Sequence, residues 1–190
     1  MTEKDNFTVQ PAQPADIDWV FNLAVQNSRA NVPDRSQVFV QGSAENSNAY
    51  DRWRQSGSLF ILKNVDLGEN AGFVVVQMNN SKQMQGPPIL QYLFSHEQSL
   101  SFEGVPLTEI SWTMYRPVLI DAQYRGMGLA RLLMDFAVDI AREKGYRLLI
   151  AFIGFENQKS LAVHQALGMK VIEKVHLPQG IYYLMGKRIA

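Results

Sequence analysis

Apolar and polar residues follow the most regular pattern in the second half of the chain, between residues 129 and 153. Apolar side chains recur every three or four positions at Leu129, Leu132, Leu133, Phe136, Ala137, Ile140 and Ala141. This spacing predicts an amphipathic helix with a broad buried stripe, and Gly145 is placed to end it. The uninterrupted apolar run that follows, 146–153, is typical of a strand covered on both faces.

Shorter patterns continue to the C-terminus. Residues 158–167 predict a short helix that stops at Gly168, and two final strands are expected at 169–176 and 181–189.

The first half of the chain predicts one helix and a series of strands. The helix is expected at 14–26, where apolar residues have helical spacing. Apolar runs rich in β-branched and aromatic residues predict strands at 7–11, 58–65, 71–78, 89–94 and 109–120. The polar stretch at 27–49 predicts a long loop or an irregular helix, and the one at 79–88 predicts a turn.

The strand expected at 109–120 contains Pro117. Because proline has no N–H to donate to a sheet ladder, we expect a bulge or an edge position there. Strands and helices in this order predict one mixed α/β domain that spans residues 1–190.

The composition is that of an ordinary globular protein, with 46% hydrophobic and 19% charged residues. Cysteine is absent, which excludes disulfides and a thiolate nucleophile. His96 and His176 have no second ligand at a metal spacing, so no metal site is expected. The segment MTEKDNFTVQ is not a signal peptide, and no apolar run approaches the ~20 residues of a membrane span. We therefore expect a cytoplasmic protein without a membrane partner.

The net charge is zero, which argues against a nucleic-acid partner because nucleic-acid-binding domains usually carry a basic excess. The charges are unevenly distributed, however. Residues 65–115 hold one basic and five acidic residues, whereas residues 116–190 hold eleven basic and six acidic ones. The C-terminal part therefore suits an anionic ligand, although charge blocks of this size are usually solvated faces.

Two glycines stand where the longest predicted helix begins, in RGMGLA (125–130). Glycine within a helix costs about 0.8–1.0 kcal/mol relative to alanine, so the pair needs another reason. The first N–H groups of a helix lack internal acceptors and attract anions, and glycine removes the Cβ atoms that would keep a pyrophosphate away. The third glycine of a dinucleotide fingerprint and the Gly-Lys-Ser/Thr of a P-loop are both missing. Taken alone, the six residues fit a phosphate-binding loop and a plain strand-to-helix turn about equally well.

The glycine loop and a second segment together resemble the GNAT superfamily of N-acetyltransferases. Residues 125–130 match its Arg/Gln-x-x-Gly-x-Gly/Ala signature. Residues 157–169, NQKSLAVHQALGM, resemble its second CoA segment, in which an Asn, a small residue and Tyr-x-x-x-Gly-Phe mark a helix. Ala122 replaces a frequent proline, and His164 stands where the family usually has tyrosine. The resemblance covers the chain from about Glu109 to the end and extends weakly to the first strand and helix.

The resemblance implies a fold, a co-substrate and a set of binding residues. The fold is a central mixed, mostly antiparallel sheet of about seven strands, splayed near the fourth strand and flanked by helices. The co-substrate is acetyl-CoA, held by a core at about 109–170, with acceptor-side loops at about 27–57 and 79–108. Exposed N–H groups of the fourth strand would polarise the thioester carbonyl, and the amides from Tyr124 to Leu132 should face an open notch for the pyrophosphate. The implied binding residues are Val118, Leu119, Ile120, Arg125, Gly126, Met127, Gly128, Leu129, Ala130, Arg131, Asn157 and Ser160.

The same resemblance implies two catalytic residues. His164 would protonate the departing CoA thiolate in place of the family's tyrosine, since imidazole has a pKa near ~6.5. Alternatively, it bonds a backbone carbonyl or packs against pantetheine. Glu109 is the general base by analogy, with Glu97, Glu103 or a water chain as alternatives, and each acid could instead be a solvated surface group. Asn157 would bond pantetheine or act as a helix N-cap.

The implied activity is direct transfer of an acetyl group to a primary amine, of a small molecule or a peptide, in a ternary complex. The alternatives are a non-catalytic acyl-CoA-binding or regulatory module and a nucleotide-binding α/β domain. No motif identifies the acceptor. Family habit makes a homodimer one option, and the sequence leaves the oligomeric state open.

Overall fold

The central sheet has seven strands in the order β1-β2-β3-β6-β7-β9-β8. We describe residues 6–34, 47–77 and 88–190 of a computed structural model. The strands are β1 Phe7–Pro11, β2 Leu59–Asn64, β3 Glu69–Val76, β6 Trp112–Ile120, β7 Leu148–Gly154, β8 Lys170–Leu177 and β9 Gly180–Arg188. Neighbouring strands run antiparallel except β6 and β7. The predicted mixed, mostly antiparallel sheet flanked by helices is confirmed.

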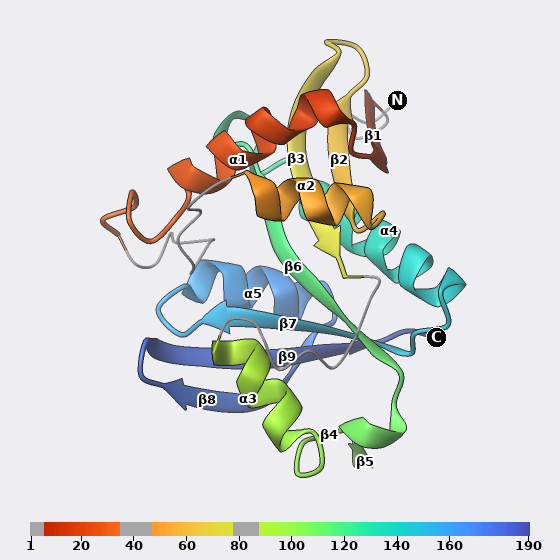
Figure 1. Ribbon diagram of the computed structural model, residues 1–190, viewed down its shortest axis with the longest axis vertical. Helices are drawn as coiled ribbons and strands as arrows, with labels where there is room; N and C mark the ends of the chain where they lie inside the picture. The colour runs from red at the N-terminus through yellow and green to blue at the C-terminus, as the bar shows by residue number, and fades with distance from the viewer. Residues whose placement is uncertain (1–5, 35–46, 78–87) are drawn as a thin grey trace.

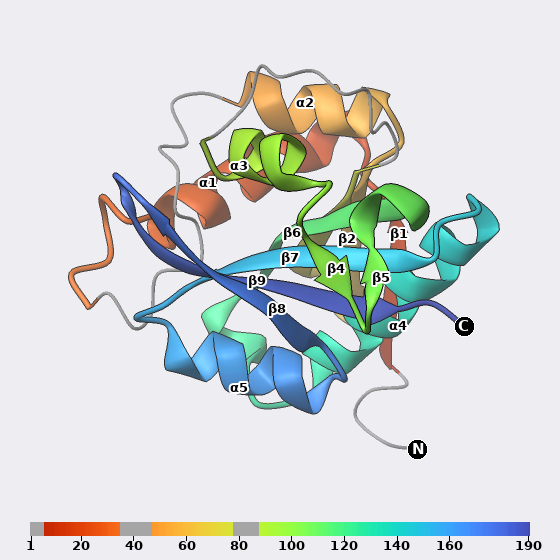
Figure 2. The same ribbon diagram turned by 90° about the horizontal axis from the view of Figure 1, so that it is seen from below.

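Helices cover both faces of this sheet. They are α1 Ile17–Gln26, α2 Asn48–Gln55, α3 Pro88–His96, α4 Leu129–Glu143 and α5 Gln158–Ala166. Figure 2 shows α1, α2 and α3 on one face and α4 and α5 on the other. Figure 1 labels these helices together with the small second sheet formed by β4 (Ser101–Phe102) and β5 (Val105–Pro106). Short 3-10 turns occur at η2 Pro14–Asp16, η4 Leu107–Glu109 and η5 Ala122–Tyr124.

Buried apolar side chains form one large cluster on the α4 and α5 face and two on the opposite face. The large cluster contains Leu129, Leu133 and Ala137 of the predicted helical stripe. On the opposite face, α1 and α2 pack over β2 and β3 in one cluster, and α3 packs over β7 and β9 in another. The two clusters meet β6 at different places, because Met114 belongs to the α3 cluster and Leu119 to the α1–α2 cluster.

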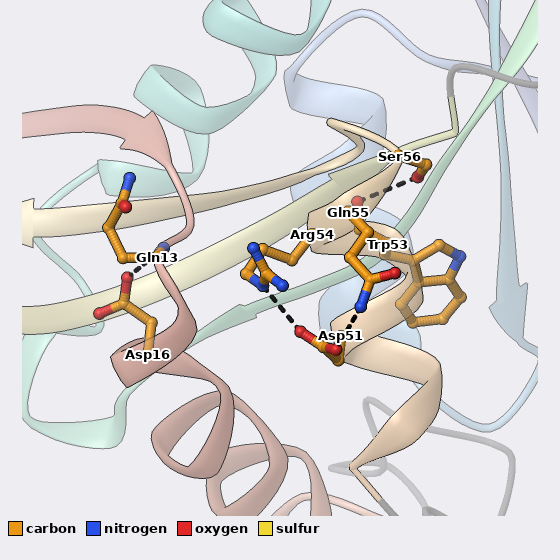
Figure 3. Close-up of polar contacts among 7 residues, drawn as sticks. All are labelled: Gln13, Asp16, Asp51, Trp53, Arg54, Gln55 and Ser56. Carbon is orange, nitrogen blue, oxygen red and sulfur yellow. Dashed lines mark hydrogen bonds and ion pairs between the residues drawn. The ribbon is translucent and has the colours of Figure 1, made fainter.

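Polar side chains fix the beginning of α1 and the course of α2 (Figure 3). The Asp16 carboxylate accepts a hydrogen bond from the Gln13 N–H at 2.7 Å and one from the Asn70 amide at 3.0 Å, which ties the turn before α1 to β3. In α2, Asp51 accepts from Arg54 Nε at 2.7 Å and from Gln55 Nε2 at 2.6 Å. Pairs at this spacing stabilise a helix by about 0.2–0.5 kcal/mol each.

Two segments differ from the sequence expectation. The strand expected at 89–94 is part of helix α3, whose Ile89, Leu90 and Leu93 are buried in the α3 cluster. A short apolar run fits a strand or a helix equally well, so the pattern alone did not decide it. Residues 48–55 of the expected acceptor-side loop form α2 instead. The rest of that loop at 35–46 and the turn at 79–87 lie outside the described residues.

Strand β6 is central, and its two ends behave differently. Its first residues pair with β7 from Trp112 to Met114, and the pairing stops there. On its other side β6 stays paired with β3, but the register shifts by one residue between Tyr115 and Val118. The bulge expected at Pro117 is therefore present, in a central strand and not at an edge. Beyond Met114 the strands β6 and β7 part, as the resemblance implies.

Candidate active site

A cleft of about 460 Å³ opens where β6 and β7 part. It is lined by the end of β6, the loop that leads into α4, and α5. Ten of the predicted binding residues line it, namely Val118, Leu119, Ile120, Arg125, Gly126, Gly128, Leu129, Ala130, Arg131 and Ser160. Met127 is not among its lining residues, because its side chain packs against the large apolar cluster. Asn157 lines a smaller adjoining cavity.

The loop before α4 leaves the beginning of this helix open. Gly126 and Gly128 have φ angles of 83° and 74°, a left-handed conformation that glycine adopts without steric cost. Gly128 is the N-cap, so no side chain caps α4. A Cβ atom added at Gly126 would meet no atom within 4 Å. The loop thus has the room that a pyrophosphate requires at a helix beginning. Of the amides expected to face the notch, those of Tyr124, Arg125 and Arg131 instead donate to the carbonyls of Asp121, Ala122 and Gly128.

Three cations line the cleft, and none of its described lining residues is Asp or Glu. Arg125 donates from Nε to the Ile120 carbonyl at 3.0 Å and from a second nitrogen to Asn27 Oδ1 at 2.8 Å. Arg131 reaches the Ala166 carbonyl at 3.3 Å, at the far end of α5. The third cation, Lys159, was not predicted, although the basic excess of the C-terminal part was a signal for it. The electrostatics of the cleft favour a polyanion.

The backbone of β6 presents free N–H groups to the cleft. The Asp121 N–H bonds to the Ala71 carbonyl of β3 at 2.9 Å. The N–H groups of successive residues point to opposite sides of a strand. The N–H of Leu119 therefore also points to β3, whereas the N–H groups of Val118 and Ile120 point toward the side where β7 is no longer paired. Of the three predicted amides, two therefore face the opening.

A smaller cavity of about 50 Å³ continues the cleft through the opening in the sheet. Tyr115, Val118, Ser160 and His164 line both spaces. Tyr115 was missed by sequence reasoning, because an aromatic residue in an apolar strand carries no signal of a site.

Asn157 is the N-cap of α5. Its side-chain oxygen accepts a hydrogen bond from the Ser160 N–H at 2.9 Å, and only 2% of the residue is exposed. Of the two roles that the sequence left open, the structure shows the capping role. The cap fixes the first turn of α5 and with it the position of Ser160 in the cleft.

His164 lies one turn further along α5 and is buried. Its Nδ1 is 2.8 Å from the Ser160 carbonyl, so Nδ1–H donates there and Nε2 carries the free lone pair of the neutral ring. The ring stands edge to face against Tyr115, with centroids 6.0 Å apart. Burial lowers the pKa of His164, and the bond to the Ser160 carbonyl opposes that shift only in part. The imidazole is therefore neutral at pH 7.

None of the three predicted acids lies at the site. Glu109 is exposed in η4, before the start of β6, and lines neither cavity. Six residues of extended strand between Trp112 and Val118 span roughly 20 Å, which keeps it away from the cleft. Glu97 accepts from Trp112 Nε1 at 3.0 Å, and Glu103 pairs with Lys170 and Arg188.

The described ranges, 6–34, 47–77 and 88–190, show no sign of a metal centre or of a membrane-spanning helix. They contain no group of three or more His, Cys, Asp or Glu that could hold a metal ion. No helix within them is long and apolar enough to span a membrane.

Residues 30–169 match the sequence profile of the Acetyltransferase (GNAT) family. The chain belongs to this family. A segment of 59 residues is 37% identical to the L-amino acid N-acyltransferase MnaT of Escherichia coli (strain K12), and it covers 31% of this chain and 34% of that protein. The match thus spans about a third of the length of this curated relative.

Solved structures share the GNAT fold over nearly the whole chain. Ard1 from Thermoplasma volcanium has a TM-score of 0.65 and 14% identity, and the match covers 97% of this chain and 99% of that one. Spermidine N-acetyltransferase from Vibrio cholerae, in complex with CoA and spermine, has a TM-score of 0.64 and 13% identity, with 97% and 96% covered. The Salmonella typhimurium protein yncA, solved with its cofactor acetyl-CoA, has a TM-score of 0.64 and 15% identity, with 97% and 95% covered.

At these identities the structural neighbours show the fold alone. The GNAT family membership agrees with the predicted enzyme class, an N-acetyltransferase that uses acetyl-CoA.

Proposed function

We propose that this protein transfers an acetyl group directly from bound acetyl-CoA to the primary amine of a bound acceptor. The observation that carries the proposal is the cleft itself, in which an uncapped helix, three cations and the end of β6 meet. The described residues that line the cleft include no Asp or Glu, whose negative charge would repel the phosphates of CoA.

The residues of the cleft fit acetyl-CoA. The N–H groups at the beginning of α4, with Arg131 and Lys159, would hold the pyrophosphate. When bound, acetyl-CoA supplies a thioester carbonyl that an amine can attack. The N–H groups of Val118 and Ile120 would donate to the oxygen of that carbonyl, where negative charge develops in the transition state. Removal of one such donor typically lowers the rate by about 10²–10³-fold.

His164 is the proton carrier in this proposal. The amine must first lose one proton from its ammonium form to water. As the neutral amine bonds to the carbonyl carbon, Nε2 of His164 accepts a second proton from the amine nitrogen, and it returns that proton to the CoA sulfur as the carbon–sulfur bond breaks. The lowered pKa of His164 suits this order of events, because the resting ring is neutral. The place of Glu109 outside both cavities supports a mechanism without this carboxylate.

The names of related proteins leave the acceptor open. GNAT enzymes act on amines, and the relatives named above include an enzyme of L-amino acids and one of spermidine. The proposal therefore specifies a primary amine and, at this stage, nothing finer.

The test combines acetyl-CoA binding with turnover. We expect saturating acetyl-CoA to raise the melting temperature, and an amine from a broad panel to release CoA thiol. Arg131→Gln should raise the KM for acetyl-CoA about tenfold, whereas Arg142→Gln, on the same helix but away from the cleft, should change it less than twofold. Binding without turnover on any amine would favour the non-catalytic acyl-CoA-binding module, and no melting shift would refute both.

A further inference from the structure

Arg116 is a partly buried cation that no carboxylate pairs among the described residues. Its Nε atom is buried and has no hydrogen-bond partner in the described part of the protein, whereas Arg125 donates from Nε to the Ile120 carbonyl and Arg131 donates from another nitrogen to the Ala166 carbonyl. Burial lowers its pKa to about 10, so the side chain still carries its charge at neutral pH. Proteins normally pair a charge that is removed from water, because an uncompensated one is costly. Arg116 thus has an unmet need for an anion.

The position of Arg116 in the fold points to the acceptor side of the sheet. Arg116 is next to Tyr115, at the irregularity of β6 where the pairing register with β3 shifts. Along β6 it falls between Met114 of the α3 cluster and Leu119 of the α1–α2 cluster, where the apolar cover of that face is interrupted. It lines the smaller cavity together with His164.

The other cations of the site lie apart from Arg116. Arg125, Arg131 and Lys159 line the large cleft on the α4 and α5 side, and Arg116 does not line it. The phosphates of CoA therefore account for those three cations and leave Arg116 without a ligand. No Asp or Glu occurs among the described residues that line either cavity.

We propose that Arg116 binds a carboxylate of the acceptor, so that the acceptor is an amine that also carries an acid group close to its nitrogen, as an amino acid does. This inference rests on the proposed acetyl transfer. A guanidinium binds a carboxylate with two parallel hydrogen bonds, which fixes orientation as well as charge. Val118, whose N–H would donate to the reacting carbonyl, lines the same small cavity as Arg116. One small molecule in this cavity would therefore reach both groups, with its amine at the carbonyl and its carboxylate at Arg116.

The experiment compares matched pairs of acceptors that differ only in the carboxylate. Phenylalanine and 2-phenylethylamine form one pair, and leucine and 3-methylbutylamine another, with CoA thiol release as the readout. We expect the wild-type protein to prefer the acid of at least one pair by tenfold or more in kcat/KM. Arg116→Gln should lower kcat/KM for that acid by about 10- to 150-fold, the range for a lost hydrogen bond to a charged group, and change that of its amine less than twofold.

Control variants separate the role of the carboxylate from a structural role. Arg131→Gln should raise the KM for acetyl-CoA and leave the ratio between acid and amine unchanged. Arg116→Lys keeps the charge without the planar fork and should lose part of the preference, and it gives the same test if Arg116→Gln does not fold. A second readout does not depend on turnover. The preferred acid should raise the melting temperature of the CoA-bound wild-type protein, and it should raise that of the CoA-bound Arg116→Lys variant by less.

Several results would overturn the inference. One is a wild-type protein that acetylates the amines as well as the acids, which would leave the proposed acetyl transfer intact. Another is an equal loss on acid and amine in Arg116→Gln and Arg116→Lys, which would make Arg116 a structural residue. A protein that neither binds acetyl-CoA nor releases CoA thiol would overturn the proposed function and this inference together.

Discussion

The two helices that border the cleft begin in opposite ways, although each follows one of the two strands that part. At α5, Asn157 accepts the N–H of Ser160 and satisfies the helix from within. At α4, Gly128 provides no side chain, and the preceding Gly126 faces open space. Glycine at an N-cap costs only a few tenths of a kcal/mol relative to a capping side chain, so α4 leaves its beginning open to a ligand at a small cost in stability. The comparison assigns binding of the phosphates to α4 and positioning of His164 to α5.

The largest effect is expected from the α5 side. His164→Gln should lower kcat by about 10²–10⁴-fold, the usual contribution of a general acid–base, and should change the KM for acetyl-CoA little. Steady-state kinetics on the best amine of the panel measure both. The matched control is His176→Gln, an exposed residue of β8. A normal kcat in His164→Gln would remove the proton carrier from the mechanism.

Changes at the beginning of α4 should alter the KM for acetyl-CoA, not kcat. Gly126→Leu places a side chain in the space proposed for the pyrophosphate, and we expect the KM for acetyl-CoA to rise tenfold or more. Gly145→Leu is a close control, because Gly145 lies just beyond the other end of α4. Its φ angle is 82°, against 83° for Gly126, and an added Cβ atom would meet no atom within 4 Å at either glycine. Both changes should cost about 1–2 kcal/mol of stability through backbone strain. An equal KM in both variants would contradict the role of the glycine loop.

Removal of the α5 cap should act on stability first. Asn157→Ala loses the bond to the Ser160 N–H and should lower the free energy of unfolding by about 1 kcal/mol, measured by urea denaturation. Asn157→Ser can restore a capping oxygen and should recover part of the loss. If alanine and serine behave alike, the cap is not what holds the beginning of α5.

The smallest effect concerns stability in acid. Because the folded pKa of His164 is lowered, the unfolded chain binds more protons between pH ~6.5 and that lower value, and stability falls as the pH falls through this window. Urea midpoints at pH 7.5 and pH 5.5 should therefore differ more in the wild-type protein than in His164→Gln. Equal differences would show that the burial of His164 does not shift its titration.

Local features of the site could be read from the sequence, because they depend on neighbours in the chain. The glycine loop, the stripe of α4 and the segment from Asn157 to His164 each combine residues within about one or two helical turns. The same logic failed for 89–94, since a short apolar run fits two kinds of element, and only packing on the α3 cluster selects the helix. Glu109 was chosen by analogy with the family and not by local spacing, and the structure places it a whole strand away from the cleft.

The sequence by itself determined where a phosphate-binding helix begins and which family the chain resembles. Both depend on glycine conformation and residue spacing, which are local properties. Only the tertiary structure decided that the pairing of β6 and β7 ends at Met114, that Lys159 joins the cations of the cleft, and that the buried Nε of Arg116 has no partner among the described residues. The physical reason is that burial, pairing and exposure of a charge depend on elements far apart in the chain, and no spacing along one strand encodes them.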